Sequence, residues 1–471
     1  MNLANLKTPG VYIDEVSKFP PSIAAVETAI PAFIGYTEQA RYNGEDYINR
    51  PLRISSLIEY VEFFGRAKKE TGIVVTFDQT TSATGQILKE TVTADIPTGR
   101  MPYLMYYTMQ AFFANGGGSC WIVSVGDYST NDILATALTG GLNEVRLIDE
   151  PTLLLFPDAL SIQGAADYYT LYTEAIQQCV DLQDRFTLLD VIQPFRRLKR
   201  TELNGLLASF RSGLSGNTDS LKYAATYFPI TMMSFDYEYD ESTIQVVKRV
   251  NNQAGSPQAF GTANGREKSQ ARTAIRDLAV MLPASAASVG VYARVDSSRG
   301  VWKAPANESI IGFQDLTYKM NDEDQRDFNV DVNDGKSVNV IRYFTGKGNK
   351  IWGARTLAGN DNEWRYIPVR RFFNMVEESA KKATFQFVFE PNDINTWVKV
   401  KAMIENFLVL QWRAGALQGV TPEKAFYVRV GLNETMTAID ILEGRMIVEI
   451  GMAVVRPAEF IILRFSHKLP E

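Results

Sequence analysis

The residues that most often carry enzyme chemistry are scarce in this chain of 471 residues. The single histidine is His467, so Ser-His-Asp catalysis, Cys-His catalysis and most metal sites would all depend on it. The two cysteines, Cys120 and Cys179, lie in apolar stretches, where buried thiols of a protein folded in a reducing cytoplasm are expected. We therefore expect no catalytic residues, no metal site and no cofactor.

The glycine-rich and acidic motifs of the chain also lack the spacing that binding sites require. Gly335-Lys336-Ser337 ends like a phosphate-binding loop, but Val330 stands where the leading glycine is required. The same valine occupies the first ligand position of the calcium-loop lookalike that runs from Asp331 to Gly335. Gly116–Gly118 follows an expected helix and precedes an expected strand, which predicts a tight turn rather than a dinucleotide site. Carboxylate pairs suited to glycosidase chemistry stay open, since 54 acidic residues always offer some pairing.

Composition excludes further classes of protein. The net charge of −6 is unfavourable for nucleic-acid binding, which relies on neutralising phosphates. No run of eighteen apolar residues predicts a transmembrane helix, and we expect no signal peptide. With 45% hydrophobic residues over this length, two to four globular domains are expected.

Strand and helix patterns alternate through the first half of the chain. This alternation predicts an α/β core with a largely parallel sheet. The expected strands are 30–36, 121–125, 153–157 and 186–191, and the expected helices are 55–64, 101–114 and 168–179. The Thr-rich segment 71–99 indicates a surface β insertion, and the polar segment 251–270 indicates a loop. Residues 328–332 and 338–341 flank Asn-Asp-Gly, which predicts a hairpin.

Both terminal regions contain strand patterns without an obvious partner. Near the start, 11–16 is strand-like and precedes Pro20-Pro21, so this region is expected to be an extended arm. Near the end, a helix over 394–413 is followed by strand patterns at 426–430, 445–455 and 459–465. Apolar edge strands of this kind require a partner to cover them.

Several stretches, in order along the chain, resemble the tail sheath proteins of contractile phages and related injection systems. They include Thr8–Glu15, Phe112–Gly118, Gly290–Arg294, Arg299–Asn307, Trp352–Leu357, Phe389–Asp393, Gly431–Thr437, Glu443–Gly451 and Val455–Ile461. The resemblance implies a subtilisin-like-topology α/β core (28–345, with the insertion 71–99) and a C-terminal α+β domain facing an inner tube (346–455). It also implies an N-terminal arm (1–27) and a C-terminal arm strand (456–471).

The function implied by this resemblance is structural and not enzymatic. Subunits would polymerise as stacked hexameric rings around an inner tube protein, between a baseplate and a terminator, and would contract without nucleotide hydrolysis or membrane insertion. The particle would be a virion tail or an injection system assembled in the bacterial cytoplasm. Arm contacts between subunits are expected at Val11, Tyr12, Ile13, Val16, Phe460, Ile461, Ile462 and Leu463. Asp440 and Glu443 are the candidates that face the tube. The alternatives are a peptidase, which lacks a core histidine, and another tail component such as a tube or baseplate protein.

Overall fold

The computed structural model describes residues 23–97, 102–130, 132–331 and 333–463, and their packing forms two compact units. Unit 1 contains residues 23–26 and 376–455, and unit 2 contains residues 27–375 and 456–463. The sequence placed a boundary after residue 345, whereas the packing places it after Met375. The difference arises because β18 (Gly348–Ile351) pairs with β17 (Val338–Phe344) in the sheet of unit 2. The strand predicted at 11–16 lies outside the described residues.

An eight-stranded sheet forms the centre of unit 2, in the order β18-β17-β10-β9-β8-β1-β7-β4. The six inner strands are mutually parallel, and the two outermost strands are antiparallel to their neighbours. The strands not yet given are β1 (Pro31–Gly35), β4 (Leu52–Ile54), β7 (Cys120–Ser124), β8 (Leu153–Leu155), β9 (Phe186–Asp190) and β10 (Ala224–Phe228). Every residue of β1, β8, β9 and β10 is buried, as parallel strands covered on both faces require. The predicted α/β class is confirmed.

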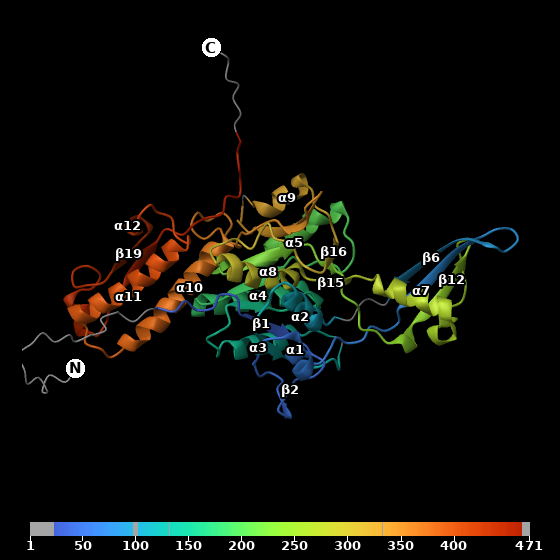
Figure 1. Cartoon of the computed structure of the whole chain (residues 1–471), viewed down its shortest axis with the longest axis horizontal. Coiled ribbons are helices and arrows are strands. Elements are labelled where there is room, and N and C mark those ends of the chain that lie inside the picture. Colours follow the sequence, from blue (N-terminus) through green and yellow to red (C-terminus); the bar gives the residue numbers. More distant parts are fainter. Residues whose placement is uncertain (1–22, 98–101, 131, 332, 464–471) are drawn as a thin grey trace, which may run out of the picture. The chain divides into compact units, whose positions relative to one another are not determined.

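Helices cover both faces of this sheet (Figure 1). Along β1, Ala32 and Ile34 belong to one apolar cluster and Phe33 to the other, so alternate side chains fill two cores. The first cluster takes in side chains of α3 (Ala135–Val145), α4 (Ala165–Leu182) and α5 (Leu203–Gly213). The second takes in side chains of α1 (Leu57–Phe64), α2 (Met105–Ala114) and α8 (Ala284–Arg299).

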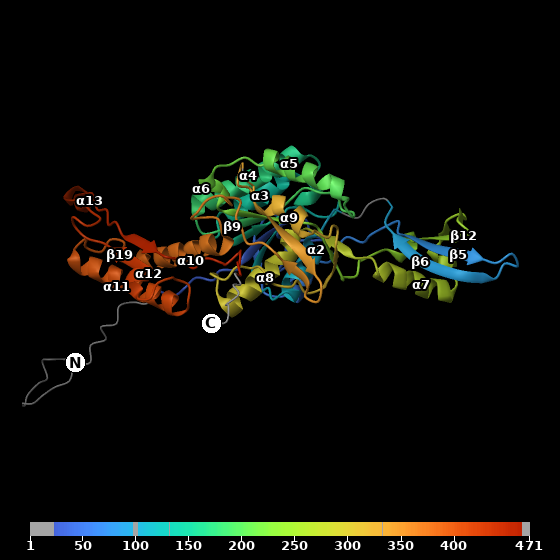
Figure 2. The same cartoon turned by 90° about the horizontal axis from the view of Figure 1, so that it is seen from above.

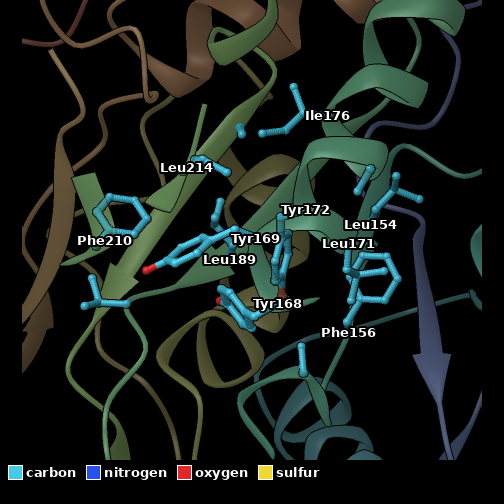
Figure 3. Packing of buried hydrophobic residues seen from close by; sticks show 14 of the residues in the cluster. Leu154, Phe156, Tyr168, Tyr169, Leu171, Tyr172, Ile176, Leu189, Phe210 and Leu214 are labelled. Carbon is cyan, nitrogen blue, oxygen red and sulfur yellow. The ribbon is translucent and has the colours of Figure 1, made fainter. Parts of the chain in front are cut away.

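Aromatic packing makes the first cluster dense (Figure 3). The rings of Phe156 and Tyr172 pack edge to face with their centroids 5.5 Å apart, and the ring centroids of Tyr168 and Tyr172 are 4.8 Å apart. Cys179 lies in this cluster and Cys120 in the other, and neither is exposed. Burial raises the pKa of both thiols, so the prediction of plain buried cysteines is confirmed.

The predicted β insertion is a real element, but it is larger than the sequence indicated (Figure 2). Its hairpin of β5 (Val74–Thr81) and β6 (Ile87–Asp95) is extended by β12 (Gln245–Val250), which is parallel to β5. The segment 251–270, predicted to be a loop, contributes β13 (Gln253–Ala254), β14 (Gln258–Ala259) and the start of α7 (Gly265–Arg276). The loop prediction is therefore wrong in part. Phe260 of this segment belongs to a separate apolar core with Val75 and Phe77, and the rest of α7 adds Ala271 and Ile275 to it.

The predicted hairpin around Asn333-Asp334-Gly335 is wrong. Phe328 ends up buried in a helix, α9 (Asp322–Asn329), whose cap residue Asn321 accepts a hydrogen bond from the backbone N–H of Asp324 (2.8 Å). β17 instead pairs in parallel with β10 and is buried over its first five residues. The turn signal is real but local, since the Asp331 carboxylate accepts from the backbone N–H groups of residues 333 and 334.

The remaining elements of unit 2 are short. They are α6 (Thr218–Leu221), the hairpin of β2 (Arg41–Tyr42) with β3 (Glu45–Asp46), and a small antiparallel sheet of β11 (Thr231–Met233), β15 (Val280–Leu282) and β16 (Phe313–Leu316).

Unit 1 is built around α11 (Ile394–Arg413), whose bounds the sequence predicted. Asp393 caps this helix by accepting from the N–H of Thr396 at 3.0 Å. The division between the units falls within α10 (Ile367–Thr384). The other elements of unit 1 are α12 (Pro422–Ala425), β19 (Phe426–Arg429), α13 (Ala438–Leu442) and β20 (Glu449–Met452). The strand predicted over 445–455 is thus only four residues long. Among all described residues, no helix has the length and apolar character needed to cross a bilayer.

Candidate assembly interface

Unit 1 contains an incomplete sheet. β19 and β20 pair with each other in antiparallel register, and no third strand of the described chain joins them. Gly451 lies opposite Tyr427, and a Cβ there would lie 2.2 Å from the tyrosine ring. Glycine therefore lets Tyr427 cross its partner strand and donate a hydrogen bond to Glu449 at 2.7 Å. A two-stranded sheet is marginal by itself, and its outer edges are free to pair with another chain.

A groove of about 830 Å³ opens beside β20. It lies between the end of α10, the segment 387–392 and the segment 444–450, all within unit 1. Its lining is mainly apolar: Phe387, Val388, Phe389, Met446, Val448 and Ile450 all contribute. Phe389 is fully exposed and takes a positive φ of 71°, unusual for a bulky residue. An open strand edge next to an apolar groove can bind an extended peptide with large side chains.

The predicted C-terminal arm residues are exposed. Phe460, Ile461, Ile462 and Leu463 are each between 70% and 79% exposed, and they form no secondary structure. Four consecutive large apolar side chains in water are unfavourable, so this segment has the properties of an unpaired strand. The matching N-terminal residues Val11, Tyr12, Ile13 and Val16 lie outside the described residues.

The two acidic candidates lie together on a loop of unit 1. Asp440 accepts from the hydroxyl and backbone N–H of Thr437 (2.7 and 2.8 Å) and from Arg445 (2.9 Å). These hydrogen bonds, from Thr437 first and then Arg445, lower the pKa of Asp440 to about 2. Glu443 forms an ion pair with the same arginine. Both carboxylates therefore also serve to hold the loop in shape.

The apolar residues of this loop were not predicted from the sequence. Ile439 and Leu442 are 63% and 88% exposed on α13, next to the two acidic candidates. The available signal was an apolar pair at i and i+3 in a helix of one turn, which gives no core to pack against. The loop thus presents an apolar pair beside two acidic residues that share one arginine.

The cluster that looks most like catalytic chemistry lies in the core of unit 2. The Ser285 hydroxyl donates to the carboxylate of Asp190, which also accepts from the backbone N–H of Ser285 at 2.9 Å. Both residues are buried, and burial raises the pKa of Asp190 to about 7 despite these hydrogen bonds. His467 lies outside the described residues, and no histidine occurs elsewhere in the chain. The pair fixes the start of α8 against the end of β9.

Comparisons with known proteins agree on one type of assembly. Residues 359–468 match a family model described as the phage tail sheath C-terminal domain. A tail sheath protein of Burkholderia phage BcepMu is 29% identical over 116 residues, which cover 24% of this chain and 24% of that protein. The chain thus aligns with about a quarter of the length of this curated relative.

Solved structures match over almost the whole length. The chain is similar to the sheath of an extracellular contractile injection system, PVC, in its contracted state (28% identity, 98% of each chain, TM-score 0.65). It is also similar to the helical sheath of the anti-feeding prophage, AFP, in its contracted state (30% identity, 98% of this chain and 100% of that one, TM-score 0.64). Coverage of 98% of this chain means that the matches extend over both units, including the β insertion of unit 2.

Proposed function

This chain belongs to the tail sheath proteins of contractile injection systems, and from that premise we propose how it polymerises and works. Subunits form hexameric rings that stack helically around an inner tube, and contraction of this sheath drives the tube through a target envelope. The baseplate and a terminator close the two ends of the polymer. The particle is a virion tail or an injection system assembled in a bacterial cytoplasm.

The observation that carries the proposal is that one chain has both an open strand edge and an exposed apolar segment able to pair with such an edge. Unit 1 has a sheet of two strands with open edges, and residues 460–463 are apolar and exposed. In the proposed polymer, the arm of one subunit adds a strand to the β19–β20 sheet of a neighbour, with its large side chains in the apolar groove. The N-terminal arm, with Val11, Tyr12, Ile13 and Val16, adds to a neighbour in the same way.

Strand addition has the right strength for a polymer that must change shape. Each main-chain hydrogen bond contributes about 1 kcal/mol net, so on the order of five bonds give roughly 5 kcal/mol per arm. One such contact is weak, but a lattice in which each subunit makes several is stable. Because the arms are extended, the globular bodies can rotate while the strand pairing persists.

The proposal requires no catalysis. Contraction would release energy stored in the extended lattice, so neither a nucleotide nor a cofactor is needed. In keeping with this, Gly335 of the phosphate-loop lookalike ends a turn packed against Asn360, and Lys336 donates to the carbonyls of Arg211 and Leu214 (both 2.6 Å). The lysine ammonium group is therefore engaged within unit 2.

The loop that carries Asp440 and Glu443 is proposed to face the inner tube. Its support is the exposed apolar pair Ile439 and Leu442, which needs a partner, and the acidic groups beside it. The chain then divides by function into an N-terminal arm, a core with an outward insertion, a tube-facing domain and a C-terminal arm.

Electron microscopy of the purified chain beside a variant lacking residues 1–22 tests the proposal. Striated tubes or rings from the full chain, lost in the truncated variant, are expected. Single particles from both proteins at high concentration would refute polymerisation through arms. Tubes from both proteins would refute the role of the N-terminal arm alone.

A further inference from the structure

Glu459 is the one residue between Ala458 and Leu463 that is not exposed. Its carboxylate receives hydrogen bonds from three side chains of unit 2. Arg355 donates from Nε to both oxygens (3.0 and 3.1 Å) and from a terminal nitrogen to Oε2 (2.6 Å). Asn329 Nδ2 donates to Oε1 (2.7 Å), and the Tyr366 hydroxyl donates to Oε2 (3.1 Å). We name Asn329, Arg355 and Tyr366 the carboxylate socket.

The socket is rigidly joined to the central sheet. Arg355 is 4% exposed, and its backbone N–H donates to the side-chain oxygen of Asn339 in β17 (2.7 Å). The amide of Asn339 donates back to the carbonyl of Arg355 (2.8 Å) and also to Thr226 in β10 (3.2 Å). A Cβ on Gly353 would lie 2.7 Å from this amide oxygen, so glycine permits the close approach. Forces on the Arg355 side chain are thus transmitted to two neighbouring strands.

The electrostatics favour a charged Glu459. Partial burial would raise the pKa of its carboxyl group, but hydrogen bonds from Arg355 and Asn329 outweigh burial and lower that pKa below its ordinary value. The buried arginine in turn has a carboxylate partner that faces it with two oxygens. Breaking this pair would leave a buried guanidinium without its counter-charge.

We propose that the carboxylate socket anchors the root of the C-terminal arm through Glu459, so that tension on residues 460–463 is passed to the eight-stranded sheet. This inference rests on the proposed function of the arm. Without the anchor, a pull on the arm would peel residues 456–459 from unit 2 before any force reached the sheet. With it, the arm leaves unit 2 from a fixed point one residue before its apolar run.

The two stretches that meet here both carry the family resemblance in the sequence, Trp352–Leu357 and Val455–Ile461. Neither arm pairing nor tube contact accounts for an arginine and a glutamate at these positions. The side chains of Arg355 and Glu459 form a bidentate contact although they lie 104 residues apart in the chain. In the proposal, both stretches therefore serve to hold the root of the arm.

A spin label on residue 458 reports the anchor directly in the monomer. Ala458→Cys takes the label selectively, because Cys120 and Cys179 are buried. Losing hydrogen bonds to charged partners should raise the released fraction of the arm root roughly 10- to 100-fold in Glu459→Gln. A narrower spectrum is therefore expected in this variant, and a smaller change in Tyr366→Phe. Glu323→Gln, which removes an exposed pair with Arg200, is the matched control and should leave the spectrum unchanged.

Polymer stability supplies the second measurement. Sheaths of Glu459→Gln should dissociate at a lower urea concentration than sheaths of Glu323→Gln. The difference should exceed any difference in urea denaturation between the two monomers, because removal of the counter-charge of Arg355 also destabilises the monomer. An unchanged spectrum in Glu459→Gln would overturn the anchor, and a released arm root with normal sheath stability would overturn its mechanical role. If the wild-type chain forms no sheath, the proposed function and the mechanical role fall together, while the spectrum still decides whether the anchor exists.

Discussion

The central sheet of unit 2 and the small sheet of unit 1 differ in how far their own chain covers their apolar surface and strand edges. The eight-stranded sheet has helices on both faces, and residues such as Phe33 and Leu189 are entirely buried. The β19–β20 sheet has two strands, open edges and an apolar groove beside it. The first has the packing of a sheet that folds within one chain, whereas the second has the form of half a sheet.

If the arms pair as proposed, this contrast separates residues that stabilise the monomer from residues that stabilise the polymer. A side chain buried in unit 2 should then affect folding, and a side chain exposed at the arm or the open edge should affect assembly.

Ile461→Pro should abolish sheath formation and leave the monomer folded. Proline removes one main-chain donor and disfavours pairing on that side of the arm, while Ile461 is exposed and contributes no packing in the monomer. Electron microscopy and sedimentation measure assembly, and circular dichroism measures folding. Ile461→Val keeps the donor and should form normal sheaths. Normal sheaths from the proline variant would refute arm pairing at this residue.

The same truncation in the two regions should give opposite results. Phe33→Ala should lower the free energy of unfolding by about 3–5 kcal/mol, because it opens a cavity in the core of unit 2. Phe460→Ala removes an exposed ring and should leave that free energy unchanged while weakening assembly. Urea denaturation and sedimentation of both variants test the pair. A large loss of monomer stability in Phe460→Ala would mean that the arm packs on its own subunit.

Sequence patterns predicted what local periodicity determines. The buried strand around Phe33, the helix 394–413 with its Asp393 cap and the turn at Gly116–Gly118 all follow from short-range rules. The turn shows why glycine is needed there, since a Cβ on Gly117 would lie 2.6 Å from the Phe112 ring. These features depend on neighbours within about one helical turn or one strand.

Sequence patterns failed where distant segments complete one another. Residues 251–270 have no apolar run, so nothing in them indicates that α7 covers a sheet containing residues 74–95. Asn-Asp-Gly is a sound turn signal, but β17 does not pair with the segment before that turn. It pairs with β18, which follows it, and with β10, which lies more than one hundred residues earlier. Glu459 was overlooked for the same reason, because its hydrogen-bond partner Arg355 lies 104 residues earlier in the chain. Pairings across long separations are set by the whole core and leave little local trace.

The carboxyl groups of Asp190, which is fully buried, and Asp440, which is partly buried, should make stability respond to pH in opposite directions, and Asp190 should have the larger effect. Asp190 has its pKa raised to about 7 by burial, so the folded chain holds a proton that the unfolded chain has already lost above about pH 4. Stability should therefore fall as pH rises from about 4 to about 7. Thermal melting of Asp190→Asn should lack this part of the slope, and an unchanged slope would show that another group causes it.

Asp440 should have the opposite sign and the smallest effect. Its pKa is lowered to about 2, so its contribution is complete above about pH 4 and is lost only as the pH falls toward 2. Between pH 5 and 8 the loop and its Arg445 pair should be unchanged. Asp440→Asn keeps an oxygen that can accept from Thr437, the cap residue of α13, and removes the charge. Tube retention, measured by co-sedimentation of tube and sheath, should therefore decrease slightly if the carboxylate faces the tube. Leu442→Ser should decrease tube retention more than Asp440→Asn, because the Leu442 side chain is exposed and apolar. Equal retention in both variants and the wild type would show that another surface of unit 1 contacts the tube.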